Sequence, residues 1–331
     1  MTSKRPKFSN LALIEESDVE YDLSIFALGF ESRAVNLLPS VAKRTRALLA
    51  LGFDHGRELA YEENKRAFSD ASVRVEDGLS DREFEEVLRG HLKALDGESH
   101  RMVFVDVSCF SRFRLASIVH ELFSLSQSLG AGLTIDFAYS LAKFEKPDSI
   151  RQPNTVVGPA HRAFAGWSQG GYSSTAAVLG LGYEQDQALG VVEFLQAGEV
   201  WAFTPKSPVV EYKAEVDKAN DLLLSEIPPN RVLEYDVCAP TSVLATLESV
   251  VRGLGDGHSV VLVPFGPKIF VLCSLIVAAM RNEIAVWRVS QGTAIKPSDR
   301  AASHVQVGLR VAFPPQDGSS SISSNLGSQQ S

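Results

Sequence analysis

The sequence has few cysteines and no long apolar segment. Three cysteines in 331 residues, Cys109, Cys238 and Cys273, are too few and too scattered for a disulfide framework, and this suggests a reducing compartment. No apolar run reaches the roughly 18 residues of a membrane span, and the N-terminal segment lacks the apolar core of a signal peptide. We therefore expect a soluble, cytoplasmic protein that does not associate with membranes.

The sequence is also short of basic charge and of the common nucleotide-binding motifs. It has 32 Lys and Arg against 40 Asp and Glu, a formal net charge of −8 at pH 7. General nucleic-acid binders usually have a broad basic face, so we expect no such binding, although a local basic pocket is compatible with this charge. The first half lacks GxGxxG and the chain has no GxxxxGK[ST] loop, which disfavours an NAD enzyme or a P-loop NTPase. The histidines lack metal-ligand spacing, and we expect neither a cofactor nor a metal.

The first half of the chain alternates short apolar segments with amphipathic ones. Strands are expected at 22–29, 47–53, 72–76, 102–107 and 132–139, and helices at 33–43, 58–68, 81–95 and 112–129. Strands that alternate with helices of this length indicate βαβ units and a parallel sheet. The fold class is therefore α/β.

The second half repeats the alternation. Strands are expected at 176–182, 199–203, 231–237, 259–264 and 284–289, and helices at 187–196, 210–225, 241–253 and 269–281, the last of them a buried helix. A final strand at 304–312 has the composition of an edge or inter-domain strand. We expect a first Rossmann-like domain at 1–142, a Pro-, Gly- and Ser-rich linker at 143–173 and a second Rossmann-like domain at 174–313. The Ser-, Gly- and Gln-rich tail at 314–331 is expected to be disordered.

Two sequence matches suggest that the halves are tandem copies of one unit. Residues 28–31 read Leu-Gly-Phe-Glu, and residues 181–184 read Leu-Gly-Tyr-Glu. The segment 103–115 aligns with 261–272, each being a strand, a short turn with a small and a basic residue, and an apolar helix. The same elements in the same order favour an internal duplication, although any two parallel βα domains share the alternation itself.

Ligands of open parallel sheets bind beyond the carboxyl ends of the strands, which selects two turns in the first half. In the first turn, Gly29 allows close approach of a ligand, Ser32 is a candidate helix cap, and Arg33 suits a phosphate. The second turn, at 106–114, offers hydroxyls, a thiol and guanidinium groups. Its candidate ligand residues are Ser108, Ser111, Arg112 and Arg114. The alternative is a simple helix cap with solvated arginines.

The matching turns of the second half lie at 182–186 and 264–268. Gly266 and Lys268 place a tight turn and a cation at a helix start, and Lys206 follows the second strand of this half. Lys268 has the alternative of being an exposed lysine at a helix end. Gly182 and Glu184 repeat Gly29 and Glu31, and the two glutamates are expected to orient a ribose hydroxyl or an arginine, or to complement a helix dipole.

Candidates for catalysis are few. Cys109 lies between a strand and a helix, where a nucleophile can be activated, but no base is evident for it. Asp106 precedes it in the same turn, and Asp54 with His55 forms a possible acid/base pair or simply a turn.

The two first-half motifs, Leu-Gly-Phe-Glu-Ser-Arg and Asp-Val-Ser-Cys-Phe-Ser-Arg-Phe-Arg-Leu, resemble those of the CARF (CRISPR-associated Rossmann fold) sensor domains of prokaryotic immunity and their SAVED relatives. In those families these turns hold a cyclic oligonucleotide, and two domains commonly pair about a two-fold axis with the ligand across it. The resemblance implies ligand-binding roles for the matching positions, which are Gly29, Ser32, Arg33, Ser108, Ser111, Arg112, Gly266 and Lys268.

The resulting hypothesis is a non-catalytic sensor or regulatory protein that binds a nucleotide-type anion between two halves. Because no separate effector domain is evident, its output is expected to pass to a protein partner encoded nearby, within an antiviral defence system. The alternatives are an enzyme acting on a nucleotide or phosphosugar, and a scaffold subunit that has lost ligand binding.

Overall fold

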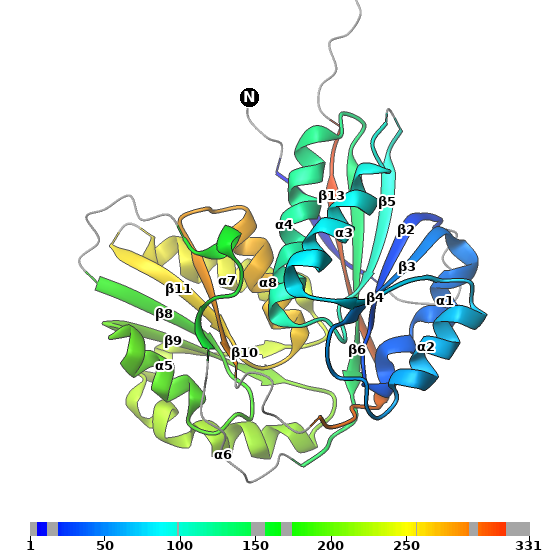
Figure 1. The fold of residues 1–331 in the computed structure, drawn as a ribbon. Helices are drawn as coiled ribbons and strands as arrows, with labels where there is room; N and C mark the ends of the chain where they lie inside the picture. The colour runs from blue at the N-terminus through cyan, green and yellow to red at the C-terminus, as the bar shows by residue number, and fades with distance from the viewer. Residues whose placement is uncertain are drawn as a thin grey trace, which may run out of the picture.

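A computed structural model describes residues 5–11, 19–97, 99–146, 156–166, 174–255, 257–290 and 297–315 (Figure 1). They form an α/β fold with two mostly parallel sheets. The expected disordered tail falls largely on 316–331, outside the described residues. In the described part of the chain, no helix is long and apolar enough to cross a membrane.

The first sheet has seven strands in the order β1-β13-β6-β5-β2-β3-β4. Their bounds are β1 Lys7–Leu11, β2 Tyr21–Leu28, β3 Thr45–Phe53, β4 Arg74–Leu79, β5 Arg101–Asp106, β6 Leu133–Ala142 and β13 Ala302–Phe313. β2 to β6 are parallel to one another, whereas β13 is antiparallel to both β6 and β1.

The second sheet has six strands in the order β10-β9-β8-β11-β12-β7. Their bounds are β7 Val156–Pro159, β8 Ser174–Gly180, β9 Glu199–Lys206, β10 Val232–Asp236, β11 His258–Pro264 and β12 Ala285–Ser290. The five strands β8 to β12 are parallel, and β7 adds to β12 in the antiparallel direction.

The two sheets have the same topology. In each half the parallel strands, numbered along the chain, lie in the order 3-2-1-4-5, and an antiparallel strand extends the sheet beyond strand 5. This is the strand order of a Rossmann-like fold. The turns after strands 1 and 4 therefore occupy equivalent places at the carboxyl edge of both sheets.

One helix or helical segment follows each of the first four strands of each half. In the first half the helices are α1 Leu38–Val41, α2 Tyr61–Asp70, α3 Asp81–Lys93 and α4 Arg112–Ser128. In the second half they are α5 Gln187–Leu195, α6 Glu211–Glu226, α7 Pro240–Leu254 and α8 Lys268–Ala279. The helix α8 is buried on all sides, as its continuous apolar sequence predicts.

The two halves share one hydrophobic core. Side chains of α3 and α4 from the first half and of α7 and α8 from the second belong to a single cluster of buried residues. The helices α4 and α8, which occupy equivalent places in the two halves, pack against each other between the sheets (Figure 1). Their N-terminal ends lie close together, because the first residue of each helix bonds to the segment that precedes the other.

Three features differ from the sequence expectations. The expected helix at 33–43 is broken into the 3₁₀ turn η1 (Ser32–Val35), α1 and the 3₁₀ turn η2 (Ala42–Arg44), because Pro39 has no N–H to continue a helix. The short strands β1 and β7 were not expected. The last strand, β13, is an interior strand of the first sheet, so the chain returns to the first half at its end.

Candidate functional site

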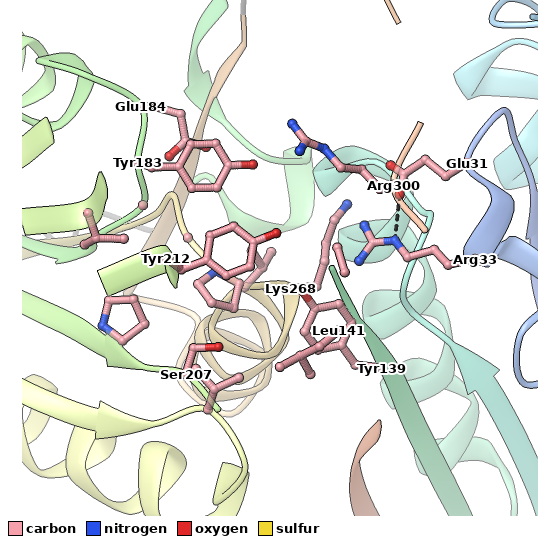
Figure 2. Close-up of a pocket in the computed structure, with 18 of the residues that line it drawn as sticks. Glu31, Arg33, Tyr139, Leu141, Tyr183, Glu184, Ser207, Tyr212, Lys268 and Arg300 are labelled. Carbon is pink, nitrogen blue, oxygen red and sulfur yellow. Dashed lines mark hydrogen bonds and ion pairs between the residues drawn. The ribbon is translucent and has the colours of Figure 1, made fainter. Parts of the chain in front are cut away.

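A cavity of about 230 Å³ lies between the two halves, at the carboxyl ends of strands from both sheets (Figure 2). Its position follows the rule for ligand sites in open α/β sheets. The cavity brings together seven of the residues that the sequence nominated for ligand binding. They are Glu31, Arg33 and Arg112 from the first half, and Gly182, Glu184, Gly266 and Lys268 from the second.

The lining of this cavity is basic although the protein is acidic. Four cationic side chains line it, Arg33, Arg112, Lys268 and Arg300, against the two carboxylates Glu31 and Glu184. Arg300 was not nominated from the sequence. It lies just before β13, and its Nη1 is 3.3 Å from Glu145 Oε2. A hollow with surplus positive charge and restricted access to water favours an anion.

Arg33 is held rigidly at one side of the cavity. Its side chain is only 7% exposed, its Nε donates to Glu31 Oε2 at 2.6 Å, and its Nη1 donates to the Ser140 carbonyl at 3.1 Å. Burial acts to lower the pKa of Arg33, but the interactions with Glu31, Cys109 and Tyr139 together outweigh burial and raise the pKa above its usual value. The guanidinium is therefore a permanent, preorganised cation.

Arg112 and Lys268, the first residues of α4 and α8, each reach across to the other half. Arg112 donates through Nε to the Pro264 carbonyl at 3.0 Å and through Nη2 to the Phe265 carbonyl at 2.8 Å. Lys268 Nζ donates to the Phe110 carbonyl. These reciprocal bonds join each helix start to the turn that precedes the opposite helix, so the two cations both line the cavity and connect the halves.

Lys268 is the titratable cation of this group. Burial, followed by the positive charge of Arg112, lowers the pKa of Lys268 from 10.5 to about 8, and Glu31 opposes the change only in part. An anion in the cavity would offset both causes, since it would supply a partner charge to the ammonium group. Lys268 is therefore mostly protonated at neutral pH and loses its charge in mildly basic solution.

A pair of stacked tyrosines forms another part of the lining. The rings of Tyr183 and Tyr212 lie 5.7 Å apart between centroids at an interplanar angle of 12°, and Tyr212 Oη donates to the Lys143 carbonyl at 2.9 Å. Burial, and then the charge of Glu184, raises the pKa of Tyr183, so its phenol stays neutral. Tyr212 was not among the residues predicted from the sequence, and Tyr183 was noted only for its place in the repeated motif.

The glycines of the second-half turns are required by close packing. A Cβ atom on Gly266 would lie 2.3 Å from the Leu181 carbonyl oxygen, and one on Gly182 would lie 2.9 Å from the Gly266 nitrogen. The turns after β8 and β11 therefore touch backbone to backbone. Gly29 is different, because a Cβ there would meet only Phe53 at an ordinary 3.9 Å. The protein neighbours of Gly29 therefore do not require a glycine, and its close approach to a ligand stays a prediction.

Two buried asparagines fix the turns after strand 1 in both halves. Asn64 on α2 donates to the Gly29 carbonyl at 2.9 Å, and Asn220 on α6 donates to the Gly182 carbonyl at 2.7 Å. These bonds are equivalent in the two repeats and hold the Gly-aromatic-Glu segments in place. Neither asparagine was expected from the sequence to have this role, although both lie at corresponding places on the second helix of each half.

Several residues that were predicted to bind a ligand instead make contacts within the first half of the protein. Arg114 is fully buried, donates to the carbonyls of Gly52 and Leu79 and pairs with Asp81. Arg112 and Arg114 point to different sides because residues two apart on a helix do not share a face. The expectation that both arginines face one ligand is therefore wrong.

The serines that were predicted to bind a ligand also make hydrogen bonds within the protein, through either the side chain or the backbone. Ser108 Oγ accepts from the Ser140 N–H, and Ser111 Oγ caps α4 by accepting from the Arg114 N–H at 3.2 Å. Ser32 does not cap a helix. Its backbone N–H donates to Asp299 Oδ1 at 2.6 Å, so a carboxylate of the protein occupies this position. Lys206 is exposed, and the cavity is lined by its neighbours Pro205 and Ser207.

The candidates for catalysis lie outside the cavity lining. Burial raises the pKa of Cys109 well above its usual value, and Glu31 adds to the effect, which keeps the thiol protonated. Asp106 is buried behind the turn, and burial raises its pKa to about 6. Asp54 and His55 form a pair at 2.6 Å in which both side chains are more than half exposed. This arrangement supplies no activated nucleophile to the cavity.

The cavity lining thus combines three guanidinium groups, one titratable ammonium group, two carboxylates and three tyrosine side chains, those of Tyr139, Tyr183 and Tyr212. Among the described residues, no group of three or more His, Cys, Asp or Glu side chains is placed to hold a metal ion. No known protein family matches the chain, and no curated protein is similar to it. The fold and this cavity define a tandem Rossmann-like α/β protein with a basic cleft between its repeats.

Proposed function

We propose that this protein is a sensor or regulatory subunit that binds a nucleotide-type anion in the cavity between its halves and signals to a protein partner. The observation that carries the proposal is the convergence of Arg33, Arg112, Lys268 and Arg300 on one cavity in a chain of net charge −8. Charge-assisted hydrogen bonds from such groups to phosphate are among the strongest polar contacts in proteins.

The resemblance to CARF and SAVED domains supports the same proposal. In those families the ligand lies across a pair of Rossmann-like domains, and here α4 and α8 form the corresponding contact within one chain. A role in antiviral defence rests on this resemblance alone. The cavity supports the binding step, and the resemblance supports the biological setting.

The contacts of Arg112 and Lys268 suggest how binding is transmitted. Both cations bond to carbonyls of the opposite half, and a phosphate would compete for the same donors with a full negative charge. Ligand binding would then change the contact between α4 and α8. A partner that senses the relative position of the two halves would read this change.

The proposal is tested by titrating nucleotides into the protein and into the Arg300→Ala variant. Arg300 suits the test because its described contact is an ion pair with the partly exposed Glu145, whereas Arg33, Arg112 and Lys268 also support the fold. A hydrogen bond to a charged group contributes about 1.5–3 kcal/mol, so the variant should bind roughly 10- to 150-fold more weakly.

Lys206→Ala is the matched control, since Lys206 is exposed and lies outside the cavity lining. It should bind as the unaltered protein does. Calorimetry that shows no binding of any mononucleotide or cyclic oligonucleotide, or equal losses in the two variants, would refute the proposal. A scaffold without a ligand would give the first of these results.

A further inference from the structure

The two repeats contribute different chemistry to the cavity. The Leu-Gly-Phe-Glu and Leu-Gly-Tyr-Glu segments align Arg33 with Asp186 and Phe30 with Tyr183. Of these four positions, Arg33 and Tyr183 line the cavity, whereas Phe30 lies against Gly56 within the first half. The first repeat therefore supplies a cation, Arg33, where the second repeat has an acid. The second repeat supplies a phenol, Tyr183, where the first repeat has a phenylalanine.

This difference gives the cavity two unlike sides. Figure 2 shows Glu31 and Arg33 on one side, Tyr183, Tyr212 and Ser207 on the other, and Lys268 between them. The first side carries the fixed guanidinium of Arg33, which lies 5.8 Å from the centroid of the Tyr139 ring, and the second carries the two rings stacked on each other. A ligand with two-fold symmetry would contact Arg33 at one end and the stacked tyrosines at the other.

The size of the cavity points in the same direction. Its volume of about 230 Å³ is below the ~300–1,000 Å³ typical of pockets for drug-sized ligands. A single nucleotide is the smallest of the nucleotide-type ligands, so a small cavity favours it over a ring of two or more. A single phosphorylated unit, with its phosphate toward Arg33 and its base toward the tyrosines, matches the two kinds of surface.

We infer that the ligand is one mononucleotide bound in a single orientation, with its phosphate between Arg33 and Lys268 and its base against Tyr183 and Tyr212. This inference rests on the proposed function and specifies the ligand class. The tyrosine rings are the feature that distinguishes a nucleotide from a bare anion, because aromatic side chains bind bases by stacking. The cations are shared by both kinds of ligand.

The experiment compares adenosine monophosphate, inorganic phosphate and cyclic di-adenosine monophosphate by calorimetry with the full-length protein. We expect the mononucleotide to bind at least tenfold more tightly than inorganic phosphate, and the cyclic dinucleotide to bind more weakly than the mononucleotide. In Tyr183→Leu the ratio of the affinity for the mononucleotide to the affinity for phosphate, which is the mononucleotide advantage, should fall at least fivefold. The affinity for phosphate itself should stay unchanged. That unchanged affinity shows that the cavity is still folded. Tyr183→Phe, which keeps the ring, should retain the advantage.

The outcomes separate this inference from the proposed function. Tighter binding of the cyclic dinucleotide, or equal affinities for mononucleotide and phosphate, would overturn the inference and leave an anion sensor in place. Retention of the mononucleotide advantage in Tyr183→Leu would overturn it as well. If none of the three probes binds, the proposed function itself fails.

Discussion

The affinity of the cavity for a phosphate monoester should fall when the pH rises from 7 to 9. Lys268, with a pKa of about 8, passes from about nine tenths to about one tenth protonated over this range. The phosphate keeps its charge, since its second pKa is about 6. If only the protonated ammonium binds, affinity falls about tenfold, which corresponds to about 1.4 kcal/mol.

The direction follows from the charges that face Lys268. Arg112 and Arg33 disfavour its proton, Glu31 favours it, and a bound phosphate would favour it further. Binding therefore raises the pKa of Lys268 and draws a proton from solution. Near pH 8, where about half of the free protein lacks this proton, each binding event should take up about half a proton.

Calorimetry between pH 6.5 and 9.5, repeated in buffers of different ionisation enthalpy, measures both the affinity and the proton uptake. Lys268→Arg is the control, since an arginine stays protonated throughout, and its affinity should change less than twofold between pH 7 and 9. A constant affinity in the unaltered protein, or the same tenfold decrease in the arginine variant, would refute the assignment of this titration to Lys268.

Further predictions concern stability and reactivity. Gly266→Ala should lower the free energy of unfolding by about 1–3 kcal/mol in urea denaturation, because the added Cβ meets backbone that cannot move away, whereas Gly29→Ala should change it by less than about 1 kcal/mol. Arg114→Met should lower the same free energy by about 3 kcal/mol through loss of buried charge-assisted bonds, yet leave phosphate affinity unaltered in calorimetry. Iodoacetamide should modify exposed Cys238 faster than Cys109 at pH 8 in mass spectrometry, and faster reaction at Cys109 would contradict the contacts described for it.

The sequence predicts the alternating elements well because the central strands are largely compact apolar runs. The strands β2, β5, β8 and β11 are buried between helices, and such strands are apolar along their whole length. The edge strands β1 and β7 have only five and four residues, too few to show a period. Nothing local in β13 indicates that it joins the first sheet, since that depends on the path of the whole chain.

The predicted residues that the structure brings together are those whose position depends on topology alone. Arg33, Arg112 and Lys268 follow strands 1 and 4 of their halves, and these strands end side by side in any such sheet. Side-chain direction within a turn is not fixed by topology, which is why Arg114 was assigned to the site as well. Arg300 reaches the cavity only because β13 returns to the first sheet, so no local motif marks it.

The repeated motif was informative because its differences, and not only its identities, have structural consequences. Glu31 and Glu184 are identical, and both line the cavity. Phe30 and Tyr183 differ by one hydroxyl, and of these two only Tyr183 lines the cavity. The duplicated framework supplies equivalent turns. The substitutions between the copies give the cavity its two different sides.

The binding mode is best measured in a crystal structure of the protein grown with adenosine monophosphate. We expect phosphate density within hydrogen-bond distance of Arg33 and Lys268, with the base beside Tyr183. A cavity without ligand density at a saturating concentration of the nucleotide, or a nucleotide bound only at another surface, would contradict it.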